Sequence, residues 1–209
     1  MKGLLLKDWY MVKSYCRSYI LISLVFIVLS VIGNGNMFLV FYPCLLCGMI
    51  PVTLLGYDER SRWTEYSGTM PYTKAQLVSS KYLIGLIAQL AAILLMGIVQ
   101  GVRMRVSGEF SLNDFSVLML MMLSMAALTA SIPLPFIFKW GIEKGRMAYY
   151  ITIGFMCAAS VLASDVFKNQ LQQELRSNLF FIVLPVLGIA AYVLSWYLSI
   201  VFYKKREIR

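Results

Sequence analysis

The sequence predicts an all-α integral membrane protein, a single transmembrane domain over residues 1–209 in which six helices cross the membrane. Of the 209 residues, 60% are hydrophobic and 14% are charged, whereas soluble domains have about 45–50% apolar and about 25% charged residues. The mean hydropathy is +0.74. The charged residues flank apolar runs, as membrane topology requires. We therefore attribute the net charge of +9 to topology and predict no nucleic-acid partner.

Residues 1–17 predict a short amphipathic helix that lies along the inner surface of the membrane. On a helical wheel, apolar side chains such as Leu4 and Val12 fill one half, and basic side chains such as Lys2 and Lys13 fill the other. Asp8 lies on the apolar half and is an exception to the pattern. A cleaved signal peptide is the alternative, but the basic region is long and no Ala-x-Ala-like cleavage site follows it.

Six apolar runs follow, at about residues 18–32, 37–56, 74–102, 115–138, 147–163 and 179–203. The first is short, because a hydrocarbon core of about 30 Å needs roughly 20 helical residues. The second contains Pro43 and Pro51, each of which removes a helical hydrogen bond, so we expect kinks there. The fourth contains a methionine-rich stretch at residues 118–125, which suits either lipid-facing filler or a surface for varied apolar partners.

Six spans place both termini on the same side of the membrane, and the positive-inside rule makes that side cytoplasmic. In this topology, fifteen of the 19 lysine and arginine residues lie on the side of the termini. The other four, on the opposite side, are Arg103, Arg105, Lys168 and Arg176. A five- or seven-span arrangement would spoil this partition.

The longest polar interruption, residues 57–83, lies between the second and third spans and carries seven charged side chains. Trp63 and Tyr66 are three residues apart, so on a helix they share a face. A proline then breaks the segment, and Thr73 with Gln76 forms a capping box that starts a new helix. A short charged and aromatic helix in this position suits a cytoplasmic loop that another protein grips. An ordinary solvated loop is the alternative.

Residues that are missing exclude several kinds of chemistry. The chain has no histidine, which excludes histidine-based catalysis, metal binding and proton relays. No charged residue lies in a span core, where ion-coupled carriers usually need one, and there is no phosphate-binding P-loop. Cys44 and Cys47 have C-x-x-C spacing, but they lie in a span beside Pro43, and we interpret them as packing residues. We expect no enzyme, and no metal or cofactor in this chain.

Weakly polar side chains remain inside the predicted spans. Their ordinary role is hydrogen bonding between helices, and the alternative is the lining of a path for an amphipathic cargo. The candidates for such a path are Gln89, Gln100, Ser124, Thr129 and Ser131.

Three segments of the chain resemble small bacterial ABC type-2 permeases. They are MKGLLLKDWYMVKS at residues 1–14, MPYTKAQLVSSKYL at residues 70–83 and PLPFIFKWGIEKGR at residues 133–146. The two later segments are similar to loop motifs of that family, with Met70 where leucine is commoner. The resemblance extends over the whole chain and its six-span plan, although hydrophobic helices contribute little to it.

The resemblance implies the transmembrane subunit of an ATP-driven exporter in the bacterial plasma membrane. Two such chains, identical or related, would pair among the membrane lipids, and each would dock a separate cytoplasmic ABC ATPase that holds ATP and Mg. The segment Asp58–Gly68 would be a coupling helix, and the short basic loop before the fifth span would be a second contact. The implied contact residues are Asp58, Glu59, Arg62, Trp63, Glu65 and Tyr66 in the first segment and Lys139, Lys144 and Arg146 in the second.

The resemblance also indicates the cargo. Members of the family export amphipathic peptides, such as phenol-soluble modulins and bacteriocins, or confer resistance to them. A bundle without buried charge suits a cargo of this kind, or a lipid-like one, better than an ion or a sugar. The alternative from another class is a non-transporting membrane sensor or immunity protein that binds a peptide or a partner protein, since topology alone says nothing about turnover.

Overall fold

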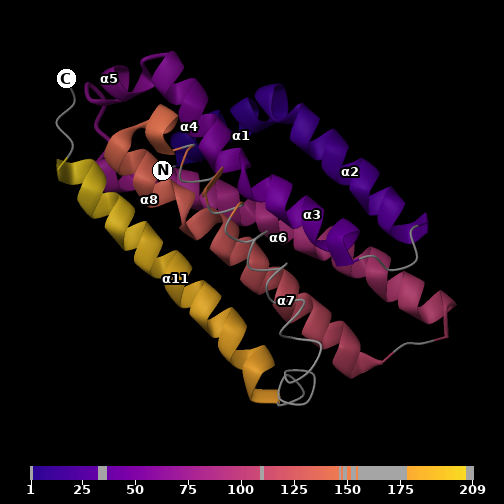
Figure 1. Cartoon of the computed structure of the whole chain (residues 1–209). Coiled ribbons are helices and arrows are strands. Elements are labelled where there is room, and N and C mark those ends of the chain that lie inside the picture. The colour runs from indigo at the N-terminus through magenta and orange to yellow at the C-terminus, as the bar shows by residue number, and fades with distance from the viewer. Residues whose placement is uncertain are drawn as a thin grey trace.

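The computed structural model describes residues 2–32, 37–108, 111–145 and 178–205, together with Met147, Tyr150, Ile151 and Gly154. Within these ranges the regular elements are all helices, which confirms the all-helical part of the predicted fold class. Labelled as in Figure 1, they are α1 (Lys2–Tyr15), α2 (Arg17–Ile32), α3 (Met37–Gly48), α4 (Ile50–Arg60), α5 (Trp63–Ser67), α6 (Lys74–Val106), α7 (Leu112–Ser131), α8 (Pro133–Trp140) and α11 (Asn178–Lys205).

Among the described residues, four helical stretches are long and apolar enough to cross a membrane: Leu39–Arg60, Lys74–Val106, Leu112–Trp140 and Pro185–Lys205. A fifth would be the pair α1 and α2, which are bent by 66° relative to each other. With 16 residues, α2 is short for a complete span, as the sequence predicts. The structure therefore supports four or five spans where the sequence predicts six. Most of the remaining predicted span, residues 147–163, lies outside the described residues.

Proline divides two of the long stretches into separate helices. The second predicted span breaks at Met49, between α3 and α4, and Pro51 occupies the first turn of α4. In a first turn the missing N–H of proline removes no helical hydrogen bond. Pro133 begins α8 in the same way, directly after α7. In place of the kink expected at Pro51, the second span has a helix break at Met49, two residues before this proline. Pro43 lies inside α3.

The longest helix, α6, starts as the sequence predicts. The side chain of Thr73 accepts a hydrogen bond from the backbone N–H of Gln76, and the side chain of Gln76 accepts one from the backbone N–H of Thr73. The predicted capping box is therefore formed. At about 1.5 Å per residue, the 33 residues of α6 extend well beyond a hydrocarbon core of about 30 Å. This helix can therefore connect the membrane with elements at its surface.

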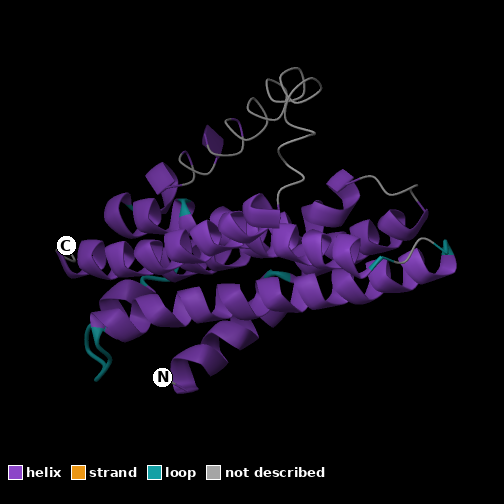
Figure 2. Cartoon of the chain, turned by 90° about the horizontal axis from the view of Figure 1, so that it is seen from below, coloured by secondary structure: helices purple, strands orange, loops and turns teal. Residues whose placement is uncertain are grey.

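The long helices run side by side, with α11 packed along α7 and α8 and with α3 packed against α6 and α7 (Figures 1 and 2). Met122 of α7 and Met96 of α6 are fully buried in the core between them. Gly97 allows Met119 of α7 to approach the backbone of α6, because a Cβ atom at position 97 would lie only 1.7 Å from Cε of Met119. Some methionines of this stretch therefore pack in the core. The sequence predicts either lipid-facing residues or a surface for varied apolar partners, and neither interpretation includes core packing.

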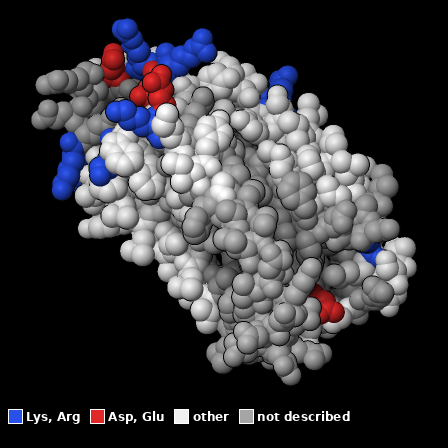
Figure 3. All heavy atoms as spheres, in the orientation of Figure 1, with Lys and Arg blue, Asp and Glu red and all other residues white. Residues whose placement is uncertain are grey.

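Apolar side chains also cover the outside of the bundle, as a membrane protein requires. Leu94 and Ile98 of α6 and Leu187 of α11 are each more than 60% exposed. Figure 3 shows most of the charged side chains on this face of the molecule gathered at the end where α5 and the last turn of α11 lie. We call this the charged end. α1 lies there too, because Lys7 contacts Asp58 of α4, so α1 and the last turn of α11 lie at the same end of the molecule.

Candidate functional site

The chain makes a turn at Arg62, between α4 and α5. Its φ of 53° lies in the left-handed region, which costs about 1–2 kcal/mol for a residue with a Cβ. The turn is held because the carbonyl of Arg62 accepts hydrogen bonds from the N–H groups of Glu65 and Tyr66. The predicted helix Asp58–Gly68 is therefore not continuous. Asp58 belongs to α4, and α5 is a separate helix of five residues.

Four charged side chains meet beneath this turn, and we call them the charge quartet: Lys7 and Asp8 of α1, Asp58 of α4 and Lys81 of α6. The Nζ of Lys81 lies 2.5 Å from Oδ1 of Asp8 and 2.6 Å from Oδ2 of Asp58. The Nζ of Lys7 lies 2.6 Å from Oδ1 of Asp58 and 3.5 Å from Oδ1 of Asp8. Two cations and two anions thus join three helices that are far apart in the sequence.

Burial makes the quartet sensitive to any change of charge. Asp8, Asp58 and Lys81 are 1%, 3% and 5% exposed. A buried ion pair contributes little net stability because both charges lose their hydration, but removal of one partner leaves a buried charge uncompensated. Burial also lowers the pKa of Lys7 below its ordinary value, and the positive charge of Lys81 adds to this, against the opposing effect of Asp58. The quartet therefore holds α1, α4 and α6 together as long as it stays complete.

Lys7 also connects the quartet with α5. Its Nζ lies 4.1 Å from the centroid of the Trp63 ring, within the range of a cation–π interaction. The rings of Trp63 and Tyr66 lie 5.6 Å apart, so these two residues share a face of α5 as their spacing predicts. Tyr66 is 58% exposed. An aromatic pair thus lies at the surface on a short helix that is braced from below by a buried cluster of charges.

The second predicted contact segment lies beside this turn. The backbone N–H of Ile142 donates a hydrogen bond of 3.0 Å to Oε2 of Glu59, which joins the end of α4 to the residues after α8. Gly141 makes the turn after α8 with a φ of 85°. The Nζ of Lys139 lies 5.0 Å from the ring of Trp140 and 5.1 Å from that of Phe202. The two predicted segments therefore form one continuous surface.

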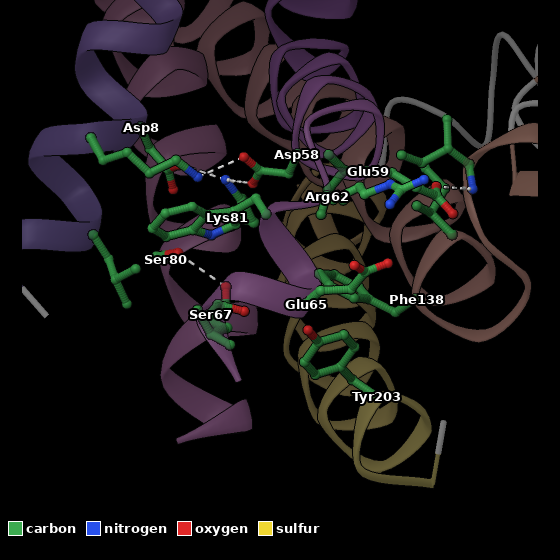
Figure 4. Close-up of a pocket in the computed structure, with 17 residues that line it drawn as sticks. Asp8, Asp58, Glu59, Arg62, Glu65, Ser67, Ser80, Lys81, Phe138 and Tyr203 are labelled. Carbon is green, nitrogen blue, oxygen red and sulfur yellow. Dashed lines mark hydrogen bonds and ion pairs between the residues drawn. The ribbon is translucent and has the colours of Figure 1, made fainter. Parts of the chain in front are cut away.

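A cavity of about 300 Å³ lies between α1, α4, α5, α6, α8 and the last turn of α11 (Figure 4). Its floor holds the buried members of the quartet, and Figure 4 shows Lys81 between Asp8 and Asp58. Its rim carries exposed charged side chains, among them Glu65. Apolar side chains complete the lining, including Leu55, Ile137, Phe138 and Ile142.

The structure separates the predicted contact residues into two groups. Glu59, Arg62, Glu65 and Tyr66 are exposed around the turn, and Trp63 is half-buried beside them. Asp58, by contrast, is buried in the charge quartet and is not available to an outside partner. In the second segment Lys139 and Lys144 are exposed, and Arg146 lies outside the described residues.

The residues predicted to line a cargo path lie away from this cavity, and their side chains form hydrogen bonds within the chain. Gln89 donates to the carbonyl of Ala126 at 2.7 Å, and Gln100 donates to Oγ of Ser30 at 3.4 Å. The hydroxyls of the other three each donate to a carbonyl of their own helix, α7: Ser124, Thr129 and Ser131. These contacts are those of helix packing, and a role in cargo movement stays a prediction.

Sequence reasoning did not assign Lys7, Asp8 and Lys81 to the site. One signal was present, because Asp8 lies on the apolar half of the amphipathic helix. The structure shows that this face, which includes Leu4 and Val12, packs inward, and that the carboxylate of Asp8 meets Lys81 there. A carboxylate on an apolar face indicates a buried cation elsewhere in the chain, but the sequence does not identify which one.

Metal and cysteine chemistry find no support in the described residues. No three of the His, Cys, Asp or Glu side chains there are arranged to hold a metal ion. Cys44 and Cys47 are free thiols and buried. Each packs in an apolar cluster, Cys44 beside Met96 and Cys47 beside Ile50, which fits their interpretation as packing residues.

A comparison with protein families places this geometry in context. The family model described as ABC-2 family transporter protein matches residues 3–204, nearly the whole chain. No curated protein and no solved structure matches the chain.

Proposed function

This chain belongs to the ABC-2 transporter family, and on that premise we propose that it is a permease subunit driven by a separate cytoplasmic ATPase that docks at the charged end. ABC-2 permeases are membrane components of transporters and normally work with an ATPase partner. ATP and Mg would be bound by that partner, and a second permease copy, identical or related, would complete the assembly. The observation that carries the proposal is the aromatic pair on α5, braced by the charge quartet.

The surface around α5 has the composition of a small, specific docking site. Trp63 and Tyr66 supply an aromatic anchor, and aromatic residues dominate the energy of many protein interfaces. Exposed charges surround this anchor, among them Glu59, Arg62 and Glu65. Such charges contribute more to the orientation and rate of binding than to its strength. Lys139 and Lys144 extend the surface on the other side of the Glu59–Ile142 hydrogen bond.

The geometry also provides a way to pass movement into the membrane. A force on α5 acts on Trp63, which lies over Lys7 of α1, and Lys7 is paired with Asp58 of α4. Asp58 is in turn paired with Lys81 of α6, the longest of the described helices. Closure of an ATPase pair would therefore shift α1, α4 and α6 together, and the permease would alternate between inward-facing and outward-facing states.

We propose an amphipathic peptide or a lipid-like molecule as the exported cargo. Apart from Asp58 and Lys81, which are buried in the charge quartet at the charged end, the spans carry no charged residue in their cores, so further along the membrane they offer no charged site for an ion or a strongly polar solute. The outer faces of α2, α6 and α11 are apolar, which leaves room for contact with lipid and with a second permease copy.

The experiment is a Trp63→Ala variant, co-expressed with the ATPase that co-purifies with the chain and reconstituted in lipid. We expect the variant to insert and fold normally but to lose stimulation of ATP hydrolysis. Trp9→Ala is the matched control, because Trp9 is a tryptophan of α1 that is 53% exposed and lies outside the cavity lining. Full stimulation in Trp63→Ala would contradict docking at α5. A chain that purifies without any ATPase would favour the sensor or immunity protein instead.

A further inference from the structure

The cavity at the charged end has two chemically different walls. One is apolar and includes Leu55, Leu77, Ile137 and Ile142. The other carries four carboxylates against three cationic side chains. A volume of about 300 Å³ is enough for one long side chain of another protein. The shape and the lining therefore suit an occupant with an apolar stem and a polar head.

The charge balance indicates the sign of that head. Within the charge quartet, two cations are matched by two carboxylates. The exposed rim adds Arg62 and two carboxylates, of which Glu59 also accepts the N–H of Ile142, so the lining contains four carboxylates and three cationic side chains. The rest of the chain is basic, since the net charge of the protein is +9. Carboxylates therefore outnumber cationic side chains in this lining, whereas the chain as a whole is basic, and this difference favours a cationic occupant.

A second and independent observation comes from Asp8. This residue lines the cavity and is 1% exposed, and its Oδ1 is paired with Lys81. Its Oδ2 is buried and has no hydrogen-bond partner among the described residues. A buried acceptor without a donor is costly, so such atoms normally have a partner. Beside the cavity there is therefore a buried carboxylate oxygen for which no described residue supplies a donor.

We propose that this cavity receives the side chain of one lysine or arginine of the partner ATPase. This inference rests on the function proposed above and specifies the chemistry of the docking site. The aliphatic stem lies along Leu55 and Ile142, and the cationic head donates to the carboxylates of Asp8 and Glu65. Long basic side chains commonly combine an apolar contact along the stem with a charged contact at the tip.

The position of the cavity explains why one basic side chain would matter. The cavity lies between α5 and the segment around Ile142, which are the two proposed contacts with the ATPase. A basic group placed beside Lys139 or Lys144 on this face would meet repulsion from these side chains. If the partner binds in a different position, its basic side chain lies near these lysines and is repelled. A single cavity that accepts the basic side chain therefore fixes the position in which the partner binds.

The first test locates the occupant in the complete complex. A photo-cross-linking phenylalanine analogue replaces Leu55, which lines the cavity, and the full chain is purified with its ATPase. The control carries the analogue in place of Leu6, which is 57% exposed on α1 and does not line the cavity. Mass spectrometry should find the Leu55 cross-link in an ATPase peptide that contains lysine or arginine, and the Leu6 cross-link in lipid.

The second test measures the charge itself. Glu65→Gln should weaken binding of the ATPase about fivefold, which is the size of effect expected for an exposed ion pair. Asp114→Asn should leave binding unchanged, because Asp114 is an exposed acid in the first turn of α7, outside both proposed contacts and outside the lining. Replacement of the identified ATPase lysine or arginine by methionine should weaken binding at least tenfold. That change and Glu65→Gln should not be additive, since both remove one interaction.

The outcomes separate this inference from the proposed function. An ATPase that binds and is stimulated, but whose cross-linked peptide has no basic residue, overturns the assignment of the cavity alone. The same holds for cross-linking of Leu55 to lipid, or for additive effects of the two charge changes. If no ATPase co-purifies in any condition, the proposed function fails and this inference fails with it.

Discussion

Two neighbouring residues of α6, Lys81 and Tyr82, belong to polar clusters of opposite character. Lys81 faces α1 and α4 and completes the charge quartet. Tyr82 faces α11, where its hydroxyl lies 2.7 Å from the hydroxyls of both Ser195 and Ser199. Ser195 in turn donates to the carbonyl of Ser131 of α7. We call the second group, which joins α6, α7 and α11, the hydroxyl cluster.

The difference between the clusters indicates their roles. The hydroxyl cluster is neutral and its hydroxyls have partners, so it is suited to hold three membrane helices in place. The charge quartet is ionic, lies beside a cavity and leaves Oδ2 of Asp8 without a partner in the described residues. Buried charges are costly and respond strongly to their surroundings. We therefore assign structure to the hydroxyl cluster and coupling to the quartet, and the following experiments test this division.

The largest loss of stability should come from Lys81→Met. The change leaves two buried carboxylates with Lys7 as their remaining partner, and the removal of one member of a buried ion pair costs about 3–5 kcal/mol. Thermal unfolding in detergent measures the change. Lys74→Met is the control at the start of the same helix, where the side chain bonds a carbonyl at the surface. The double change with Asp8→Asn should recover part of the loss, and no recovery would contradict the pairing.

Lys7→Met should have a smaller effect on stability but a clear one on coupling. It removes a hydrogen bond between charged groups, worth about 1.5–3 kcal/mol, while Asp58 keeps its pair with Lys81. It also removes the cation under Trp63, so stimulation of the ATPase should fall although the complex still forms. Lys7→Arg should retain most of the stimulation. Lys13→Met, an exposed change on the same helix, should behave like the wild type.

Tyr82→Phe should lower the free energy of unfolding by about 1 kcal/mol, because one buried hydroxyl and its bonds to two serines are lost. Stimulation of the ATPase should not change, since this cluster joins α6 to α7 and α11 and includes no residue of α1, α4 or α5. Tyr197→Phe is the control, because Tyr197 is 65% exposed on α11. A loss of stimulation in Tyr82→Phe, with normal stability, would show that our division between structure and coupling is wrong.

The smallest effect should come from Gln89→Leu, at about 0.6 kcal/mol, which is typical of one hydrogen bond between membrane helices. Gln100→Leu should cost less still, because its bond to Ser30 is longer, at 3.4 Å. Both variants also test the predicted cargo path. If either one changes transport of an amphipathic peptide in vesicles while stability stays near that of the wild type, the residue acts on cargo and not only in packing.

Much of this architecture could be predicted from the sequence, because it depends on local patterns. The capping box at Thr73 and the shared face of Trp63 and Tyr66 follow from fixed spacings along a helix. Other features could not be predicted in this way. The left-handed turn at Arg62 divides the expected coupling helix in two, and nothing in the residue type requires that conformation. The sequence places Asp58 among the expected contact residues, but in the structure Asp58 is buried and paired with Lys81, 23 positions away along the chain.

The sequence by itself determined the class of the protein, its apolar helices and the two segments that resemble permease loops, since hydropathy, helix capping and spacing act over a few residues. Tertiary structure alone decided which charges are buried and which remain at the surface. Ion pairs between Lys7, Asp8, Asp58 and Lys81 require that α1, α4 and α6 meet in space, and the cavity exists only between packed helices. Coulomb energy depends on distance in space and on burial, and neither can be obtained from positions along the chain.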